Sequence, residues 1–219
     1  LGLGIPSVWF MNGLHCRVLS AECPYDVTGV SFPAEPLVVL GHNRHIAWGA
    51  TNANPDVQDL FVETVDPADP GRYLVDGKSV PFQVRTETIK VAGGDPVTMT
   101  VRTTGHGPVI NDVDNRLKDQ SKVLALRWTA LVEVDHTLES FLAIDQAASY
   151  ADFRAALSVY AAPAQNFVYA DVDGHIGYQL PGLIPLRAKG SDGRRPVDGS
   201  VSANDWSGYL KYDDLPRQL

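Results

Sequence analysis

One stretch of the chain concentrates side chains that could bind a hard cation. Residues 48–61, WGATNANPDVQDLF, carry oxygen donors between two apolar segments, at Asn52, Asn54, Asp56, Gln58 and Asp59. Asp56 and Asp59 are three residues apart, so in an irregular loop both carboxylates could face one ion, with an intervening backbone carbonyl as a third oxygen. The alternative is a solvated polar loop held by Asx turns, and composition alone favours that alternative.

Motifs of the common hydrolases and nucleotide-binding proteins are missing from the sequence. The nearest approach to the serine-hydrolase motif G-x-S-x-G is GVSFP, residues 29–33, which ends in proline. Neither the phosphate-binding motif G-x-x-x-x-G-K-[ST] nor a G-x-G-x-x-G after a strand occurs. None of the six histidines stands in an H-E-x-x-H arrangement, and we expect His42, His45 and His106 to be turn residues.

The two cysteines, Cys16 and Cys23, have six residues between them and no other Cys or His cluster around them. A zinc site is therefore not expected. Two alternatives remain open from the residues: a pair of free thiols, or a local disulfide that closes a short loop and implies an oxidising compartment.

Charge and composition exclude several classes of protein. The chain has 219 residues, with 18 Lys and Arg against 26 Asp and Glu, for a net charge of −8. A nucleic-acid binder would need a basic face. No apolar run reaches the length of about 18 residues that a membrane-spanning helix requires. The chain begins at Leu1 without a secretory signal pattern, so we expect a processed or excised piece of a larger protein.

Most of the chain shows the patterns of strands and hairpins that would position these residues. Alternation and turn signals predict hairpins over 36–51, 73–82, 84–105 and 164–180, and strands over 60–65 and 122–128. In the hairpin over 84–105, Ile89 and Val91 are expected opposite Val97, Met99 and Val101.

The spacing changes to a helical period after residue 136. Leu138, Phe141 and Leu142 follow i, i+3, i+4 spacing, and so do Phe153, Ala156 and Leu157. Ser149, three residues before Asp152, is typical of the N-cap of the second helix. The fold class is therefore α+β with a mostly antiparallel β body.

Three segments resemble the penicillin acylase (penicillin amidase) family of N-terminal-nucleophile hydrolases. They are VTGVSFPAEPLVVLGHNRHIAWGATNANPDVQDLFVE (27–63), LRWTAL (126–131) and PAQNFVYADVDGHIGYQLPGLIPLR (163–187), and DWSGYLKYDDLPR (205–217) matches the family's ordering. The resemblance implies a central part of the family's β chain. It implies a mostly antiparallel β middle domain inserted in a partial αββα N-terminal-nucleophile hydrolase core, with a short helical pair.

The resemblance also implies a domain division and a reaction. Residues 1–60 would belong to the αββα core sheet with the acyl pocket and oxyanion loop, 61–135 to the β-rich middle domain, and 136–219 to the helical pair, a hairpin and strands returning toward the core. In the family, a serine exposed by autoproteolysis attacks a substrate amide, with its own α-amine as base. That serine would lie upstream of Leu1 and the oxyanion asparagine downstream of Leu219, so the isolated chain is expected to be inactive.

Site residues transfer from the family to individual positions of this sequence. Asn52 aligns with the residue whose backbone N–H completes the oxyanion hole. Asp56, the carbonyl of Gln58, and Asp59 align with structural Ca²⁺ ligands of the full enzyme. The remaining ligands would come from the α chain and from beyond Leu219, so weak or no Ca²⁺ binding is expected in this chain alone. Four positions align with acyl-pocket walls, although ordinary core packing explains each of them equally well: Leu1, Leu40, Ala50 and Trp128.

Partners and location follow from the same resemblance. The expected partners are the α chain and the remaining β-chain segments of one precursor and a small-molecule amide, with no nucleic acid and no membrane span. The family's secreted or periplasmic habit, together with the cysteine pair, favours the Cys16–Cys23 disulfide. The competing hypothesis is a non-catalytic scaffold or binding module that retains the fold.

Overall fold

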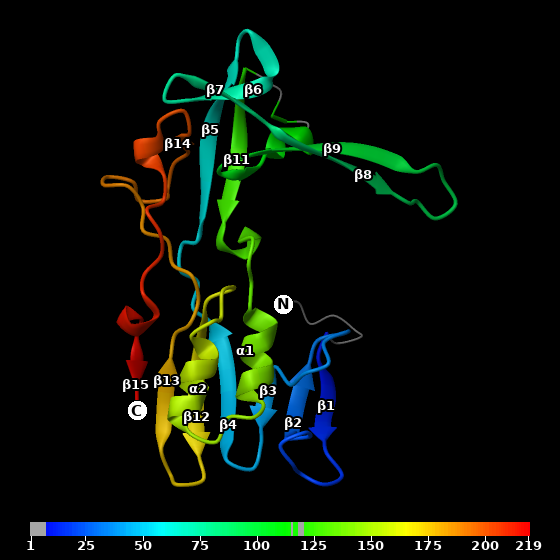
Figure 1. Cartoon of the computed structure of the whole chain (residues 1–219), viewed down its shortest axis with the longest axis vertical. Helices are drawn as coiled ribbons and strands as arrows, with labels where there is room; N and C mark the ends of the chain where they lie inside the picture. The colour runs from blue at the N-terminus through cyan, green and yellow to red at the C-terminus, as the bar shows by residue number, and fades with distance from the viewer. Residues whose placement is uncertain (1–7, 115, 118–120) are drawn as a thin grey trace. The chain divides into compact units, whose positions relative to one another are not determined.

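The computed structural model describes residues 8–114, 116–117 and 121–219 (Figure 1). The chain forms two compact units, each built from separate stretches of sequence. The first unit contains Leu1–Pro55, Val132–Ile184 and Leu210–Leu219, and the second contains Asp56–Leu131 and Pro185–Tyr209. Leu1 lies outside the described residues.

The first unit is a seven-stranded sheet with two helices. The strand order is β1-β2-β3-β4-β12-β13-β15, and every pair is antiparallel. The strands are β1 (Phe10–His15), β2 (Asp26–Ser31), β3 (Leu40–His42), β4 (Ile46–Asn52), β12 (Gln165–Asp171), β13 (Ile176–Gln179) and β15 (Arg217–Gln218). The helices, α1 (Thr137–Ile144) and α2 (Tyr150–Leu157), pack against each other on one face of the sheet (Figure 1).

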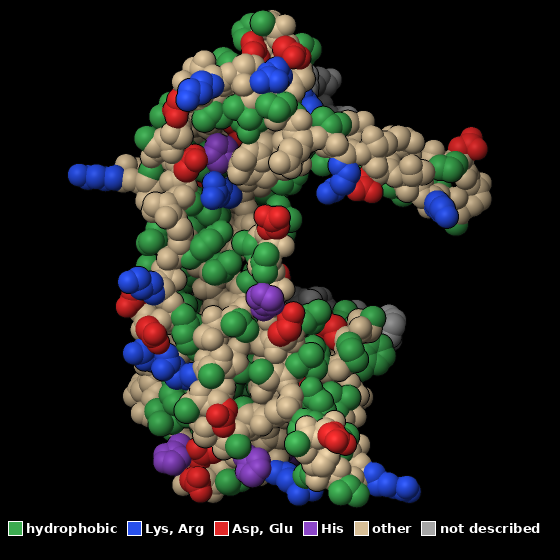
Figure 2. Space-filling model, viewed as in Figure 1, with side chains coloured by type: hydrophobic (Ala, Val, Ile, Leu, Met, Phe, Trp, Pro, Cys, Tyr) green, Lys and Arg blue, Asp and Glu red, His purple; other side chains and the backbone are tan. Residues whose placement is uncertain are grey.

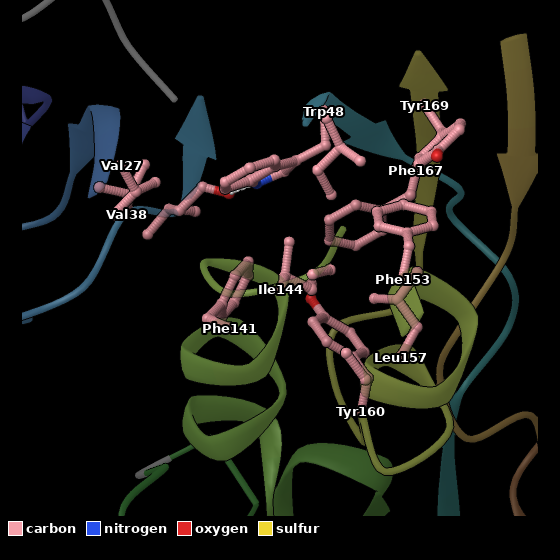
Figure 3. Close-up of a cluster of buried hydrophobic side chains, with 14 of the residues drawn as sticks. Val27, Val38, Trp48, Phe141, Ile144, Phe153, Leu157, Tyr160, Phe167 and Tyr169 are labelled. Atoms are coloured by element: carbon pink, nitrogen blue, oxygen red, sulfur yellow. Dashed lines mark hydrogen bonds between the residues drawn. The ribbon is translucent and has the colours of Figure 1, made fainter. Parts of the chain in front are cut away.

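The core of the first unit lies between that sheet face and the two helices. Side chains of α1 and α2 point toward Trp48 of β4 and toward β12 (Figure 3). Phe153, Leu157 and Phe167 are completely buried, and the Phe153 and Phe167 rings meet edge to face, 6.2 Å apart. Each such side chain contributes about 1.5–3 kcal/mol by burial, which is why eight-residue helices are stable here.

The predicted helical pair is confirmed, with one correction. Ser149 is the N-cap of α2, and its hydroxyl accepts a hydrogen bond from the Asp152 N–H at 3.1 Å. Phe141 and Ile144 of α1 are buried, but Leu138 is 53% exposed. The i, i+3, i+4 pattern assigned Leu138 to the core because spacing cannot tell a packed helix face from one that borders a cavity.

One asparagine closes the predicted turn between β3 and β4. The Asn43 Oδ1 atom accepts hydrogen bonds from the N–H groups of His45 and Ile46, at 2.8 and 2.9 Å. Its Nδ2 group donates to the carbonyls of Asp145 and Ala147, at 3.2 and 2.8 Å. The turn is therefore tied to the segment between α1 and α2.

Asp145, the C-cap residue of α1, links the helix to the segment that precedes β3. Its Oδ2 atom accepts from the Val38 N–H at 3.0 Å, and the side chain is almost fully buried. Burial raises the pKa of Asp145 to about 7, and the hydrogen bond from Val38 opposes that rise.

The loop between β1 and β2 is closed by the Cys16–Cys23 disulfide. The Cα atoms of the two cysteines are 5.8 Å apart. The backbone N–H groups of Ser20 and Cys23 also pair with each other's carbonyls within the loop. The disulfide, rather than the alternative of two free thiols, is confirmed.

The second unit contains two antiparallel sheets and one short parallel strand pair. The larger sheet has the order β11-β5-β6-β7, with β14 pairing in parallel with β5, and the smaller sheet has the order β10-β9-β8. The strands are β5 (Gln58–Asp66), β6 (Asp69–Val75), β7 (Lys78–Pro81), β8 (Gln83–Ile89), β9 (Val97–Thr104), β10 (Gly107–Pro108), β11 (Lys122–Trp128) and β14 (Val197–Asp198). Short 3₁₀ turns complete the chain at Ile110–Asp112, Thr129–Leu131, Ser202–Asn204 and, in the first unit, Tyr212–Asp214.

The hairpins of the second unit follow their turn residues. Asp76 and Gly77 both have positive φ, 49° and 74°, as a type I′ turn between β6 and β7 requires. Ile89 lies opposite Val97, as predicted, whereas Val91 lies beyond the paired residues. The strands over 60–65 and 122–128 are confirmed as parts of β5 and β11.

Contacts group the chain into the two units above, while the family ranges 1–60, 61–135 and 136–219 stay predictions. Residues 185–209 belong to the second unit, where Val197 and Asp198 pair with Phe61 and Val62 of β5. A two-residue strand has no periodicity of its own, so no local pattern predicts this pairing. The mostly antiparallel α+β class itself is confirmed.

Neither α1 nor α2 has the length and apolar character needed to cross a membrane. On the face drawn in Figure 2, Lys and Arg side chains are scattered among Asp and Glu side chains. Charges of both signs are therefore mixed on this face.

We expect Ser149→Ala to lower the free energy of unfolding by about 1 kcal/mol, because the Asp152 N–H loses its acceptor at the start of α2. Denaturant unfolding of the full protein measures this loss. Ser158→Ala, at the exposed C-cap of the same helix, is the matched control and should change the free energy by less than about 0.5 kcal/mol. Equal losses in the two variants would contradict the assignment.

Candidate active site

Among the described residues, the backbone N–H of Asn52, at the end of β4, has no hydrogen-bond partner on a neighbouring strand. In the β4–β12 ladder, the Ala53 N–H donates to the Ala164 carbonyl at 3.3 Å, which makes Asn52 and Gln165 a non-hydrogen-bonded pair. The Asn52 N–H therefore points away from β12, toward the side of β3. There β3 begins only at Leu40 and its pairing with β4 extends no further than Trp48.

The remaining groups of Asn52 are held in place. Its side-chain Oδ1 atom accepts a hydrogen bond from Gln165 Nε2 at 2.9 Å. Its backbone carbonyl accepts one from Asn166 Nδ2 at 3.2 Å. The end of β4 is thus fixed by two side chains of β12, and no described residue is found to accept a hydrogen bond from the N–H.

An apolar cavity of about 620 Å³ opens at the end of β4, and Asn52 is one of the residues that line it. Its size lies within the range of about 300–1,000 Å³ that small-molecule sites occupy. Trp9 and Phe32 stack at 4.3 Å on one part of the wall. The wall continues over β3, β4, β12 and the helical region, with Leu40, Ala50, Leu138, Phe141 and Phe167.

Three of the residues that aligned with site positions therefore lie together: Leu40, Ala50 and Asn52 line the same cavity. Trp128 ends β11 in the second unit and is 36% exposed. The roles assigned to these residues, and to Leu1, stay predictions.

The acidic loop of residues 56–59 has an arginine between its carboxylates. Arg187 donates from Nε to Asp59 Oδ2 at 2.8 Å and pairs through a terminal nitrogen with Asp56 Oδ1 at 3.1 Å. Trp206 Nε1 also donates to Asp59 Oδ2, at 2.6 Å. Asp59 is buried, so the negative charge of its carboxylate is balanced inside the second unit.

One oxygen of this cluster is left without a partner. Asp59 Oδ1 is buried and accepts no hydrogen bond from the described residues. Gly193 lies so close to the loop that a Cβ atom would stand 2.1 Å from Asp56 Oδ2. A buried, unpaired carboxylate oxygen beside closely approaching backbone is what a hard cation would satisfy. The donor set of Asp56, Gln58 and Asp59 therefore fits Ca²⁺.

A second set of donors was not singled out in the sequence. Asp171, Asp173 and His175, on the β12–β13 turn, have ligand atoms within 4.8 Å of one another. Asp171 Oδ1 accepts from the backbone N–H groups of Asp173 and His175, at 3.0 and 2.9 Å. These bonds explain the grouping as turn chemistry.

His106 lies in a turn, as expected, but its side chain is buried between two carboxylates. Its Nδ1 and Nε2 atoms are each 2.7 Å from an oxygen, of Glu63 and Asp205 respectively. The ring stacks on Phe61 with centroids 3.9 Å apart. Burial alone would lower the pKa of His106, but the two carboxylates outweigh it and raise the pKa above its usual 6.5.

Sequence reasoning missed three residues that hold these sites together: Gln165, Arg187 and the buried His106. Gln165 and Arg187 lie 113 and 128 residues from the partners they contact. Their segments carried the family resemblance, but no local pattern marks which polar side chains meet. The one available signal was the unassigned arginine in PGLIPLR, since buried aspartates are normally paired.

The fold and the cavity define the class of protein: an α+β protein with an apolar cavity at the end of a sheet, of the size that small-molecule sites have. The sequence model described as Penicillin amidase matches residues 1–219. The chain therefore belongs to the penicillin amidase family.

Individual relatives agree with this assignment. The chain is 36% identical to penicillin G acylase of Escherichia coli over 97% of its length, and 34% identical to the acyl-homoserine lactone acylase QuiP of Pseudomonas aeruginosa over 95%. A solved structure, the thermostable penicillin G acylase from Alcaligenes faecalis, superposes with a TM-score of 0.83 at 30% identity, covering 98% of this chain and 37% of that one. The chain spans about a quarter of the length of the two curated relatives, 24% and 25%.

We expect His106→Gln to destabilise the full protein most near pH 6, by about 3 kcal/mol, because a buried carboxylate then loses its cationic partner. The folded state raises the pKa of His106, so its stabilising charge is present below pH 6.5 and is lost as the pH rises through the raised value. The difference in thermal midpoint between wild type and variant should therefore shrink from pH 6 to pH 9.

His45→Gln is the matched control, because His45 is exposed on the β3–β4 turn. His45→Gln should change the thermal midpoint only slightly, and this change should not shrink between pH 6 and pH 9. A His106→Gln difference that stays constant, or grows, between pH 6 and pH 9 would show that the imidazole is neutral in the folded protein.

Proposed function

We propose that this chain supplies the acyl-binding cavity and one oxyanion donor of a penicillin-amidase-type amide hydrolase. The observation that carries the proposal is the Asn52 N–H, for which the described residues offer no partner, beside an apolar cavity in a member of this family. The acyl side chain of the substrate occupies the cavity, and its carbonyl oxygen accepts a hydrogen bond from the Asn52 N–H.

The reaction is acyl transfer through a serine carried by another segment of the same precursor. The serine oxygen bonds to the carbonyl carbon, and its proton passes by way of the α-amine to the leaving amine as the C–N bond breaks. Water then attacks the acyl ester, releasing the carboxylic acid and restoring the serine. This chain positions the acyl group and stabilises the charge on the carbonyl oxygen.

The contribution of Asn52 comes from its main chain. An oxyanion donor of this type is worth about 2.7–4 kcal/mol of transition-state stabilisation. The bonds from Gln165 and Asn166 to Asn52 fix the direction of that N–H before substrate binds. Preorganisation of this kind avoids the cost of orienting the donor during the reaction.

Asp56, the Gln58 carbonyl and Asp59 would hold a structural Ca²⁺. Bound there, the ion would be the partner of Asp59 Oδ1, which accepts no hydrogen bond from the described residues. Arg187 already balances part of the charge of the same carboxylates. Its ion pairs with Asp56 and Asp59 hold the conformation of the loop. The role of this site is stability and maturation, rather than the chemical step.

The substrate class follows from the cavity and the family. Relatives are called penicillin G acylase and acyl-homoserine lactone acylase, and both names describe removal of an acyl group. We propose a linear amide with an apolar acyl side chain, of the β-lactam, acyl-homoserine lactone or lipopeptide type. The partners are the remaining segments of the same precursor, and the disulfide supports a periplasmic or secreted location.

We expect the full protein that contains this chain to hydrolyse a chromogenic acyl anilide, and the isolated 219-residue chain to be inactive. Asn52→Pro removes the N–H without removing a ladder bond, because that N–H faces away from β12. It should lower kcat by about 10²–10³. Asn52→Ala keeps the N–H and should retain most of kcat. Steady-state kinetics on the two variants measure the difference.

Thermal midpoints and product binding check that Asn52→Pro is folded. Turnover by the isolated chain would show that the nucleophile has been misplaced. Failure of the full protein to hydrolyse any acyl amide would favour the non-catalytic scaffold instead.

The double variant Asp56→Ala, Asp59→Ala is expected to impair precursor processing and to lower the thermal midpoint of the full protein. Chelator should lower the wild-type midpoint but not that of the variant, because calcium bound only to the folded state stabilises it by about 2.7 kcal/mol at a hundred times its dissociation constant. The double variant Asp95→Ala, Glu133→Ala removes two exposed carboxylates as the matched control. Unchanged processing and midpoints would exclude the calcium site.

A further inference from the structure

The polar residues of the cavity wall are not equivalent. The Thr137 hydroxyl accepts from the Ala161 N–H at 3.1 Å, and the Tyr160 hydroxyl donates to the Pro163 carbonyl at 2.9 Å. Thr51 Oγ1 accepts from Asn166 Nδ2 at 3.4 Å. Each of these hydroxyl groups therefore already makes a hydrogen bond within the protein.

The amide pair of Asn52 and Gln165 keeps free hydrogen-bonding capacity. One bond joins Gln165 Nε2 to Asn52 Oδ1, at 2.9 Å. Among the described residues, no partner is found for Gln165 Oε1 or Asn52 Nδ2, so the pair offers one acceptor and one donor to the cavity that it lines. A hydroxyl group can use both, because it donates and accepts.

The charge on the wall favours a neutral substituent. Glu35, half-buried on the segment between β2 and β3, also lines the cavity. No ion pair to its carboxylate is found among the described residues, so its negative charge disfavours an acyl group that ends in a carboxylate. A neutral hydroxyl meets no such repulsion.

The position of the pair along the acyl chain follows from Asn52. In the proposed function, the backbone N–H of this residue binds the acyl carbonyl oxygen, and its side chain starts one atom away on the same Cα. The non-hydrogen-bonded pairing with Gln165 brings the two side chains close on one face of the sheet. The amide pair therefore lies next to the first carbons of the acyl chain.

Resting on that proposed function, we propose that Gln165, hydrogen-bonded to Asn52, is a specificity-determining residue that selects acyl groups with a neutral hydroxyl on C2 or C3 over unsubstituted acyl groups. An unsubstituted chain displaces water from the amide pair without replacing its hydrogen bonds, whereas a hydroxylated chain replaces them. The site discriminates by about tenfold, the ratio that about 1.4 kcal/mol of differential binding gives.

The test compares 3-hydroxyoctanoyl and octanoyl 4-nitroanilides as substrates of the full processed protein. Wild type should show a kcat/KM about tenfold higher for the hydroxylated amide. Gln165→Leu should bring the two values to within about twofold of each other, whatever its effect on overall turnover. Gln83→Leu makes the same chemical change on exposed β8, outside the cavity, and should keep the wild-type ratio.

A readout independent of turnover is calorimetric binding of 3-hydroxyoctanoic and octanoic acid to wild type and to Gln165→Leu. The wild-type preference for the hydroxy acid should disappear in the variant. Gln165→Met, which keeps the length of the side chain, repeats the test should the leucine variant fail to fold.

The outcomes separate this inference from the function it rests on. Hydrolysis of both amides without a preference, or with a preference that Gln165→Leu leaves unchanged, would overturn the role of Gln165 and leave the amide hydrolase standing. Hydrolysis of neither amide or any other acyl anilide would overturn both.

Discussion

The antiparallel ladder between β4 and β12 is the interaction on which the rest of the first unit depends. It joins two strands separated by more than a hundred residues in sequence, from Ile46 with Asp171 to Asn52 with Gln165. Its register places Trp48 beside Tyr169 and Ala50 beside Phe167, so that both strands present apolar side chains to the helices. The register also decides which residues form non-hydrogen-bonded pairs, and therefore which N–H and C=O groups point away from the partner strand.

The alternation of hydrogen-bonded and non-hydrogen-bonded pairs in this ladder links the stability of the first unit to the proposed role of Asn52. Because pairs in an antiparallel ladder alternate, a shift of one residue would turn the Asn52 N–H into β12 and occupy it. The same shift would move the side chains of β4 to the opposite face. The free N–H and the apolar cavity are therefore consequences of one register, and the core aromatic residues that hold the register also hold the site.

In the second unit, buried charge plays the corresponding role. Glu63 and Asp59 lie on the same strand, β5, and each is reached by a cationic or polar side chain from a distant segment: His106 in one case, Arg187 and Trp206 in the other. Leaving one buried charge unpaired costs about 3–5 kcal/mol. The segment 185–209 therefore cannot leave β5 without a large loss, which explains why the unit is discontinuous in sequence.

The sequence by itself determined the local structure. The Asp76–Gly77 turn, the Ser149 cap and the alternation of β5 and β11 depend on neighbouring residues, so a local pattern predicts them. It also identified the family and predicted Leu40, Ala50 and Asn52 as site residues, because the motifs that contain them are contiguous in sequence. The strands β1 and β2, whose sequences FMNGLH and DVTGVS alternate poorly, were not predicted.

Only the tertiary structure decided which distant polar groups meet. Nothing near Gln165 indicates that its amide bonds to Asn52, and nothing near Arg187 indicates that it joins Asp56 and Asp59. Leu138 has the spacing of a core residue and lies on a cavity, and His106 has the setting of a turn residue and is buried. Burial and long-range pairing depend on how whole strands align, and a hydrogen bond between residues a hundred positions apart leaves no periodicity in either segment.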